Sequence, residues 1–420
     1  MDTILRRNQV NERKNSMSGP LSGVKVVEVA MWAYVPSAGG MLADLGAQVI
    51  KVEPHSGDPC RGLTTGGIGP GTNGFTPQWE TYNRGKRSIA LDLRIEGADE
   101  VLHKLLEDCD VFLTSLLPAA RRQMKIDVDD IKACHPDIIY AIGSGTGPLG
   151  AEAEKGGFDM LSFWSRGGVC AGVTPADADY PLGMPSGAFG DCTSGAMLVA
   201  GINAALFQRA TSREAPVVDG SLLAASMWAM QSKITSVTLA GLDDLPKVTR
   251  SQTNNPLVNY FRTKDGRFVT LSMLQSQRYW AGLCVAMGRP DLADEARFAT
   301  AEARATNILD CVAVLDTIFA TRTLEDWQAV LATQDGQWDV VRNAGEVHRD
   351  PQVIANQFMQ DVAYEDGRSL KMVSVPLQFD RQAMKAKPAP ELGADSDTVL
   401  AELGYDEDAI IDLKVAGIIF

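Results

Sequence analysis

Asp191 is the residue of this sequence whose surroundings best suit chemistry on a bulky ligand. It lies in the run Gly187-Ala-Phe-Gly-Asp-Cys-Thr-Ser-Gly195, at a glycine-flanked turn ahead of an apolar stretch rich in small residues. Small neighbours let a ligand approach a carboxylate closely. An aspartate before such a stretch is also typical of a helix N-cap, so the pattern predicts a helix that begins just after Asp191. The residues alone leave both roles open.

The histidines and cysteines argue against a metal-centred mechanism. Only four histidines occur, none spaced as His-x-x-x-His or His-x-Glu, and the seven cysteines are scattered without a Cys-x-x-Cys pair. These patterns predict no metal site and indicate a reduced, cytoplasmic protein rather than a disulfide framework. Cys192 is a further nucleophile candidate, although a small buried hydrophobe is the commoner role of cysteine.

Length and charge restrict the class of protein further. A chain of 420 residues exceeds the size at which single cores stop growing, which predicts two domains. The net charge of −14 argues against nucleic acid or an anionic membrane as a partner. No apolar stretch reaches the roughly 20 residues that a membrane-spanning helix needs. Residues 1–19 lack the apolar centre of a signal peptide, and we expect a disordered tail there.

Short β-branched runs alternate with helical stretches from residue 21 onward. Strands are expected at 24–29, 48–53, 88–93, 110–114 and 137–142, and helices at 36–47, 96–108 and 128–134. Because short connections join them, the strands are expected to run parallel under a cover of helices. Their near-continuous apolar composition fits burial on both faces of a sheet. The pattern therefore predicts an α/β fold with a doubly wound parallel sheet.

The composition shifts in the second half of the chain. Helices are expected within 192–239. An alternating stretch at 260–273 surrounds Asp265-Gly266, which predicts a β-hairpin. Further helices are expected at 278–287, 306–319, 324–332 and 395–416, and a rigid linker at 387–390. We expect a smaller α+β domain over 250–370.

Two sets of residues at the edges of the predicted strands are candidates for ligand contact. Trp32 and Tyr34 follow the first strand, at the sheet edge where α/β proteins bind ligands, and would line a pocket or an interface. Basic residues in an acidic protein are available anchors for a phosphorylated ligand, although each could be an ordinary solvated side chain: Arg84, Lys86, Arg87, Arg121, Arg122 and Lys125.

Separated motifs recur from about residue 20 to the C-terminus, among them Gly157-Phe-Asp159 and Val218-Asp-Gly-Ser-Leu-Leu223. The full set covers residues 21–29, 42–54, 57–59, 83–93, 157–159, 190–191, 218–223, 350–353, 388–393 and 399–405. These motifs resemble those of the class III coenzyme A transferases, the family of formyl-CoA transferase, carnitine CoA-transferase and α-methylacyl-CoA racemase. So many motifs in one order make the resemblance specific.

The resemblance implies a particular architecture. A large Rossmann-like, CoA-binding domain would be built from both chain ends, at 20–225 and 375–420. A linker at 226–249 would lead to the small α+β domain at 250–370. Two such subunits interlock like links of a chain in this family, so an interlocked homodimer is expected.

The resemblance also implies a reaction. The family's catalytic aspartate falls on Asp191, which would attack an acyl-CoA thioester and form anhydride and aspartyl-CoA thioester intermediates. CoA would pass from the donor to a free carboxylic acid. The expected partners are therefore an acyl-CoA and a carboxylic acid, with the CoA thioester as a substrate and no tightly bound cofactor.

Two alternatives stay open at this stage. Racemases of the family use a His-Asp dipeptide, which here is Phe158-Asp159, so racemisation at the α-carbon would lack one of its two bases. A CoA-binding protein without catalytic activity is the second alternative. Asp159 is either a pocket residue near the thioester or an ordinary turn aspartate.

The family's CoA contacts carry over to a set of positions in this chain. They are Ala33, Tyr34, Leu91, Asp92, Leu93, Arg94, Ser115, Leu116, Arg122, Lys125, Phe158 and Asp159. Arg122 or Lys125 would substitute for a family arginine that aligns with Gln123. The formyl-CoA transferase glutamine after the first strand is Ala33 here. This departure, together with Trp32, Tyr34, Phe158, Trp164 and Trp228, predicts an acceptor acid larger and more apolar than oxalate or formate.

Overall fold

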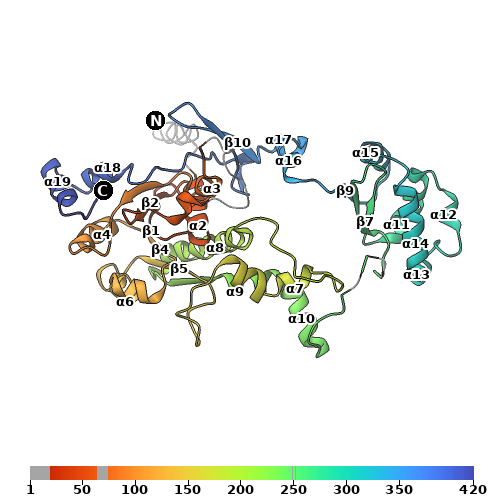
Figure 1. The fold of residues 1–420 in the computed structure, drawn as a ribbon, viewed down its shortest axis with the longest axis horizontal. Coiled ribbons are helices and arrows are strands. Elements are labelled where there is room, and N and C mark those ends of the chain that lie inside the picture. The colour runs from red at the N-terminus through yellow and green to blue at the C-terminus, as the bar shows by residue number, and fades with distance from the viewer. Residues whose placement is uncertain (1–18, 64–73, 248, 251) are drawn as a thin grey trace, which may run out of the picture. The chain divides into compact units, whose positions relative to one another are not determined.

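A computed structural model describes residues 19–63, 74–247, 249–250 and 252–420. The predicted tail at 1–19 therefore lies, apart from Gly19, outside the described residues. The chain contains a six-stranded parallel sheet in the order β3-β2-β1-β4-β5-β6 (Figure 1). Its strands are β1 (Lys25–Val29), β2 (Gln48–Glu53), β3 (Arg87–Ala90), β4 (Val111–Thr114), β5 (Ile139–Ser144) and β6 (Val217–Ser221). The prediction of a mixed α/β fold with a parallel sheet is confirmed.

The strand order creates a switch point between β1 and β4. The chain winds outward from β1 through β2 to β3, then returns to the other side of β1 at β4 and continues to β6. Crossover connections leave in opposite directions from these two neighbouring strands, which opens a crevice at their carboxyl ends. Any ligand of this sheet is expected there.

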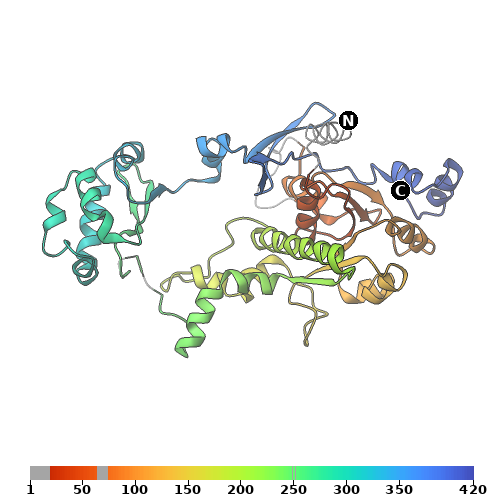
Figure 2. The same cartoon turned by 180° about the vertical axis from the view of Figure 1, so that it is seen from behind.

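Helices cover both faces of the sheet because its strands are apolar on both sides. Val26 packs with α2 (Tyr34–Asp44) and α8 (Phe189–Ser212), whereas Val27 packs in the opposite core. Adjacent strand residues point to opposite faces, so one strand supplies both cores. In the reverse view, α2 and α8 lie next to each other on the near side of the sheet (Figure 2). The opposite core contains α4 (Ala98–Leu106), α6 (Val128–Cys134), α18 (Ser396–Glu402) and α19 (Glu407–Val415).

Several element boundaries differ from the predicted ones. The strand expected at 137–142 begins two residues later and continues to Ser144, and β6 replaces part of a region without a predicted strand. The helix expected at 395–416 is two helices, separated at Gly404, whose φ of 86° ends α18. The strand at 48–53 and the helix at 128–134 match their predictions. The larger unit also contains η1 (Pro59–Gly62), α3 (Pro77–Asn83), α5 (Pro118–Gln123), the π-helix η2 (Met160–Arg166) and α7 (Val169–Val173).

The chain divides into two compact units. The larger comprises the described residues up to Thr174, 179–240 and 352–420, and the smaller comprises 175–178 and 241–351. Two segments group differently from the predicted boundaries. The linker expected at 226–249 includes the second half of α9 (Leu222–Ala229) and all of α10 (Gln231–Ala240), and both helices belong to the larger unit.

The second segment is the hairpin of β10 (Met359–Ala363) and β11 (Ser369–Val373), expected in the small domain but grouped with the larger unit. Its turn residue Tyr364 packs against Phe75 with ring centroids 4.8 Å apart and donates its hydroxyl to Glu80 on α3. These contacts attach the hairpin to the larger unit. Short strands β12 (Gln378–Phe379) and β13 (Gln382–Ala383) follow, and α17 (Pro351–Ala355) begins at the boundary.

The smaller unit has its own core. Strands β7 (Val258–Arg262), β8 (Phe268–Ser272) and β9 (Trp338–Val340) form an antiparallel sheet. The predicted hairpin at Asp265-Gly266 is confirmed, and Gly266 has a φ of 77° that favours glycine. The helices are α11 (Ser276–Met287), α12 (Asp291–Asp294), α13 (Ala301–Thr306), α14 (Ile308–Phe319), α15 (Leu324–Leu331) and α16 (Ala344–Val347).

Candidate active site

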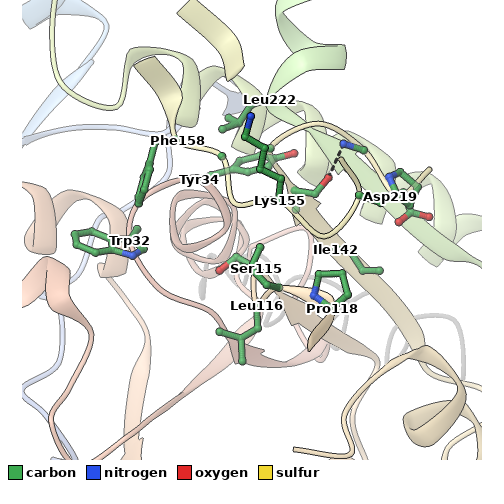
Figure 3. Close-up of a pocket in the computed structure, with 18 of the residues that line it drawn as sticks. Trp32, Tyr34, Ser115, Leu116, Pro118, Ile142, Lys155, Phe158, Asp219 and Leu222 are labelled. Carbon is green, nitrogen blue, oxygen red and sulfur yellow. Dashed lines mark hydrogen bonds between the residues drawn. The ribbon is translucent and has the colours of Figure 1, made fainter. Parts of the chain in front are cut away.

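A pocket lies at the carboxyl end of the sheet, at the switch point between β1 and β4 (Figure 3). Trp32 and Phe158 lie on one side of the drawn pocket and Asp219 on the other. Of the residues predicted to bind CoA or react, those that line this pocket are Ala33, Tyr34, Ser115, Leu116, Phe158 and Asp191. The sequence motifs that contain them are spread over 159 positions, counted from 33 to 191, yet the fold brings them to one edge of one sheet.

Asp191 lies inside the first turn of α8 rather than ahead of it. The helix begins at Phe189, and its N-cap is Ala188, which has a φ of 58° and no side-chain cap. The prediction that Asp191 is the N-cap is therefore wrong. The capping group comes from another segment, since Oδ2 of Asp159 accepts the backbone N–H of Gly190 at 3.0 Å. A helix whose first N–H groups are satisfied from elsewhere can begin before its local cap signal.

The carboxyl group of Asp191 has a strongly raised pKa. Burial raises it first, and the negative charge of Asp159 adds to the effect, so that the pKa moves from its usual 3.8 to about 7. A helix N-terminus favours an ionised carboxylate by about 0.3–1 kcal/mol. That is less than the roughly 1.4 kcal/mol equivalent to one pKa unit, so desolvation outweighs it here. The carboxylate of Asp191 is thus poorly solvated.

Asp159 caps the helix and does not line the pocket. It is buried, and its Oδ1 has no hydrogen-bond partner among the described residues. Burial raises the pKa of Asp159, while the backbone N–H groups of Gly190 and Asp191 lower it in part. The contact with Gly190 indicates that Asp159 fixes the start of α8 and thereby the position of Asp191.

Tyr34 occupies a slot that two glycines leave open. A Cβ on Gly143, in β5, would lie 2.8 Å from Cε1 of Tyr34, and one on Gly220, in β6, would lie 2.6 Å from its Oη. Burial, together with the charge of Asp191, raises the pKa of the Tyr34 hydroxyl well above its usual value, so the group stays protonated. The sequence analysis assigned neither glycine a role, although each is the last residue but one of its strand.

A second pocket holds the other predicted contacts. Leu91, Asp92, Leu93 and Arg94 line it together, after the end of β3. The side chain of Arg94 pairs with Asp92 at 2.5 Å, which lowers the pKa of that carboxyl. Met31 and Leu116 line both pockets, so the two are adjacent.

The predicted cations Arg122 and Lys125 line neither pocket. Arg122 is exposed and pairs with Glu154 at 3.0 Å. Arg121 lines the first pocket instead, where it donates to the carbonyl oxygen of Leu116 at 2.7 Å, and Lys155 lines it as well. On a short helix, a shift of one residue rotates a side chain by about 100°, which sequence spacing could not resolve.

The other basic candidates are engaged elsewhere. Lys86 is fully buried and pairs with Glu28 at 2.7 Å, so it is not a surface anchor. Arg84 pairs with Asp44 at 2.7 Å and Arg87 with Glu402 at 2.7 Å. Their charges are compensated within the protein, and the expectation that this group offers a phosphate site is not supported by its contacts.

The remaining aromatic candidates and Cys192 have structural settings. Trp164 is buried in the protein interior, and Trp228 is 65% exposed and lines neither pocket. Burial, with the charges of Asp191 and Asp159, raises the pKa of the Cys192 thiol to about 11. A thiol in this state is protonated near neutral pH and is a weak nucleophile.

Within the described part of the chain, no three or more His, Cys, Asp or Glu side chains are grouped so that they could hold a metal ion. Across the same residues, no helix is both long enough and apolar enough to cross a membrane.

The fold and the pocket define an α/β protein that carries a desolvated carboxylate at the switch point of a Rossmann-order sheet. The chain matches the family model described as CoA-transferase family III over residues 21–396, and it belongs to that family. The resemblance in the sequence motifs is thereby confirmed. Enzymes of this kind take CoA thioesters as substrates.

Two curated relatives and one solved structure illustrate the match. The (R)-2-hydroxy-4-methylpentanoate CoA-transferase of Clostridioides difficile is 30% identical over 395 residues, covering 94% of this chain and 98% of that protein. The cinnamoyl-CoA:phenyllactate CoA-transferase of Clostridium sporogenes is 27% identical over 395 residues, covering 94% and 95%. A crystal structure of a CAIB/BAIF family protein from Brucella suis superposes with a TM-score of 0.81 at 27% identity, covering 92% of this chain and all of that one.

Proposed function

We propose that this protein transfers CoA from an acyl-CoA thioester to a free carboxylic acid, with Asp191 as the nucleophile. The observation that carries the proposal is the position of Asp191: its carboxylate lines the switch-point pocket, and burial raises its pKa to about 7. A poorly solvated carboxylate has less water to shed before it attacks a carbonyl carbon.

The first half-reaction moves CoA from the donor to the protein. The ionised Asp191 carboxylate attacks the thioester carbonyl carbon, the C–S bond breaks, and CoA leaves as a thiolate from a mixed anhydride. The thiolate then attacks the aspartyl carbonyl carbon. The anhydride C–O bond breaks, the donor acid departs as a carboxylate, and an aspartyl-CoA thioester remains.

The second half-reaction runs the same steps in reverse with the acceptor. The acceptor carboxylate attacks the aspartyl-CoA carbonyl and releases the thiolate, which attacks the acceptor's acyl carbon and restores Asp191. No proton or water is consumed. Water would hydrolyse either intermediate, so the apolar wall of Trp32, Leu116 and Phe158 favours transfer over hydrolysis.

The two adjacent pockets support a binding mode for CoA. The set Leu91, Asp92, Leu93 and Arg94 would hold one end of the molecule, and Ala33, Tyr34, Ser115 and Leu116 would direct the thioester to Asp191. Arg121 and Lys155 also line the reactive pocket, and they are paired with Asp127 at 3.0 Å and with Glu152 at 3.4 Å.

The lining of the reactive pocket supports an acceptor larger and more apolar than oxalate or formate. Trp32 and Phe158 provide aromatic surface beside the carboxylate. The names of the two relatives specify acids with branched or aromatic chains, 2-hydroxy-4-methylpentanoate and phenyllactate. We propose an acceptor of that chemical class.

We also propose an interlocked homodimer in the cytoplasm, with a large domain built from both chain ends. Ser396 on α18 accepts the backbone N–H of Ala90 in β3 at 3.2 Å, which supports the shared domain. The larger unit leaves big apolar side chains exposed on η2, α9 and α10, which a second copy would cover: Met160, Leu161, Met227, Trp228 and Leu239. Light scattering during size-exclusion chromatography tests the dimer.

A mass-spectrometric transfer assay tests the reaction. The full-length protein is incubated with acetyl-CoA, butanoyl-CoA or succinyl-CoA and a panel of branched, aromatic and short carboxylic acids. A new CoA ester is the expected product, and Asp191→Ala is expected to abolish it while CoA still binds. Hydroxylamine added during turnover is expected to yield the hydroxamate of Asp191, which identifies the aspartyl intermediate.

Two other outcomes would replace this proposal. Deuterium entering the α-carbon of the acyl group from heavy water, without a new ester, would indicate a racemase. CoA binding with neither exchange nor deuterium uptake would indicate a protein without catalytic activity. CoA transfer that persists in the Asp191→Ala variant would show that Asp191 is not the nucleophile.

A further inference from the structure

Four charged side chains are buried beneath the loop that joins β1 to α2. Glu28, Lys51, Asp58 and Lys86 have side chains with no exposed surface, and they form one chain of ion pairs. Lys51 pairs with Glu28 and with Asp58 at 3.0 Å each, and Lys86 pairs with Glu28 at 2.7 Å. We call these four residues the buried ion chain. Two positive and two negative charges balance, as buried charges require.

The buried ion chain is bonded to the loop at two points and to the first turn of α2 at a third. Lys51 donates to the carbonyl oxygen of Ala30 at 2.7 Å, and Lys86 donates to that of Pro36 at 2.9 Å. Between them, Oδ1 of Asp58 accepts the backbone N–H of Trp32 at 3.1 Å. A loop is normally the most mobile part of a fold, whereas this one is held at Ala30 and at Trp32 by buried charged side chains.

Trp32 needs such support because of its backbone conformation. Its φ is 71°, in the left-handed region where a residue with a large side chain is strained. The hydrogen bond that the backbone N–H of Trp32 donates to Asp58 offsets that strain. The conformation directs the indole ring to Phe158, with ring centroids 5.8 Å apart and planes at 85°, an edge-to-face contact on the pocket wall.

We infer that Asp58 is a positioning residue for acyl selection: held by Lys51, it fixes Trp32 so that Trp32 and Phe158 form the wall that recognises an aromatic or branched acyl chain. The inference rests on the proposed function and adds to it a device in the fold that sets its specificity. Asp58 lines neither pocket, so it acts through Trp32. Trp32 is 39% exposed and Phe158 56%, so the wall has free surface to offer a ligand.

Equilibrium binding tests the inference apart from turnover. In the Asp191→Ala background, calorimetry gives the dissociation constants of 3-phenylpropanoyl-CoA and acetyl-CoA, and their ratio measures acyl selection. Trp32→Ala is expected to lower the preference for the aromatic ester about tenfold. Asp58→Asn is expected to lower it by a similar factor, because it leaves Lys51 without one of its two carboxylate partners and loosens the loop.

The double variant decides whether the two residues act as one device. If Asp58 acts through Trp32, Asp58→Asn lowers the ratio no further once Trp32 is Ala. Asp44→Asn is the matched control, since Asp44 is also buried and ion-paired, with Arg84, but contacts neither the loop nor a pocket residue named above. It is expected to leave the ratio unchanged.

Three results would overturn the inference. The first is that the Asp191→Ala protein binds both CoA esters equally well. The second is that Trp32→Ala or Asp58→Asn leaves the ratio of the two dissociation constants unchanged. The third is that the double variant lowers this ratio by the product of the two single effects. Should Asp58→Asn fail to fold, hydrogen exchange of the unaltered protein decides instead. The Trp32 amide is then expected to be protected at least a hundredfold relative to an exposed amide, and an unprotected amide would overturn the role of Asp58. A protein that binds selectively but makes no new CoA ester would refute the proposed function alone.

Discussion

Asp159 accepts the backbone N–H of Gly190 at 3.0 Å, so a carboxylate from one segment caps the helix that carries Asp191 from another. The two aspartates thus share one helix N-terminus. Burial is the larger contribution to the raised pKa of Asp191, and the charge of Asp159 adds to it. The raised pKa of Asp191 therefore depends in part on a residue 32 positions earlier in the chain.

Asp159→Asn is expected to shift the acid limb of the pH–rate profile to lower pH, by roughly one pH unit. In the proposed mechanism the attacking form of Asp191 is the carboxylate, so the rate is expected to rise as the pH passes through its pKa of about 7. Asparagine keeps an oxygen for the N–H of Gly190 and removes the charge. The measurement is kcat/KM for CoA transfer between pH 5 and 9, with Asp44→Asn as the control that leaves the limb in place. An unmoved limb in Asp159→Asn would show that the two carboxylates do not interact.

Asp191→Asn is expected to stabilise the protein at pH 8 but not at pH 4. The folded pKa, about 7, lies above the unfolded value near 3.8, so between these values the folded state binds more protons. The free energy of unfolding then falls as the pH rises, by at most about 4 kcal/mol from this group. Urea unfolding of both proteins at pH 4 and pH 8 checks the sign. An equal difference at the two pH values would contradict it.

Gly143→Ala is expected to destabilise the protein by about 1–3 kcal/mol and to weaken CoA binding. Its new Cβ would lie 2.2 Å from Cγ2 of Val35 and 2.8 Å from Cε1 of Tyr34, so the tyrosine must leave its slot. The matched control is Gly282→Ala on α11, where a Cβ meets nothing within 4 Å. That change is expected to be neutral or slightly stabilising, because alanine favours a helix by about 1 kcal/mol over glycine. Thermal unfolding and calorimetry with CoA measure both effects, and equal stability of the two variants would count against the packing argument.

Glu28→Gln is expected to destabilise the protein by about 3–5 kcal/mol, because Lys51 and Lys86 both rely on this carboxylate in the buried ion chain. An exposed pair provides the contrast. Asp291→Asn breaks the pair between Arg289 and Asp291, whose side chains are 43% and 59% exposed, and is expected to change stability by less than about 1 kcal/mol. Chemical unfolding compares the two, and similar losses would indicate that the buried charges are solvated.

The sequence predicted most of the parallel sheet because its strands are buried on both faces. Such strands are apolar runs, and 48–53 matches β2. Strand β6 was missed because Asp219 and Gly220 interrupt its apolar pattern. Its pairing with β5, which no local pattern encodes, determines it.

The sequence predicted several residues that line the pocket, but it did not predict which charged groups lie next to one another. Sequence motifs identified Asp191 and its neighbours in the pocket, but the cap from Asp159 depends on a contact between distant segments. The same limit applies to Lys86, predicted as a surface anchor and found buried against Glu28, 58 positions away. The residues next to a charged side chain in the sequence do not reveal which distant group of opposite charge pairs with it.

Met31 and Leu116 line both pockets, so two separate small ligands, one in each pocket, would meet at these two side chains. A fragment held by the Leu91–Arg94 segment and a second fragment beside Asp191 would end within reach of the same two side chains. Joining them across that boundary with a short linker makes the second contact intramolecular, and the affinity gain can exceed either fragment's own by two or more orders of magnitude. The boundary between the pockets is therefore the place from which to build a bisubstrate inhibitor.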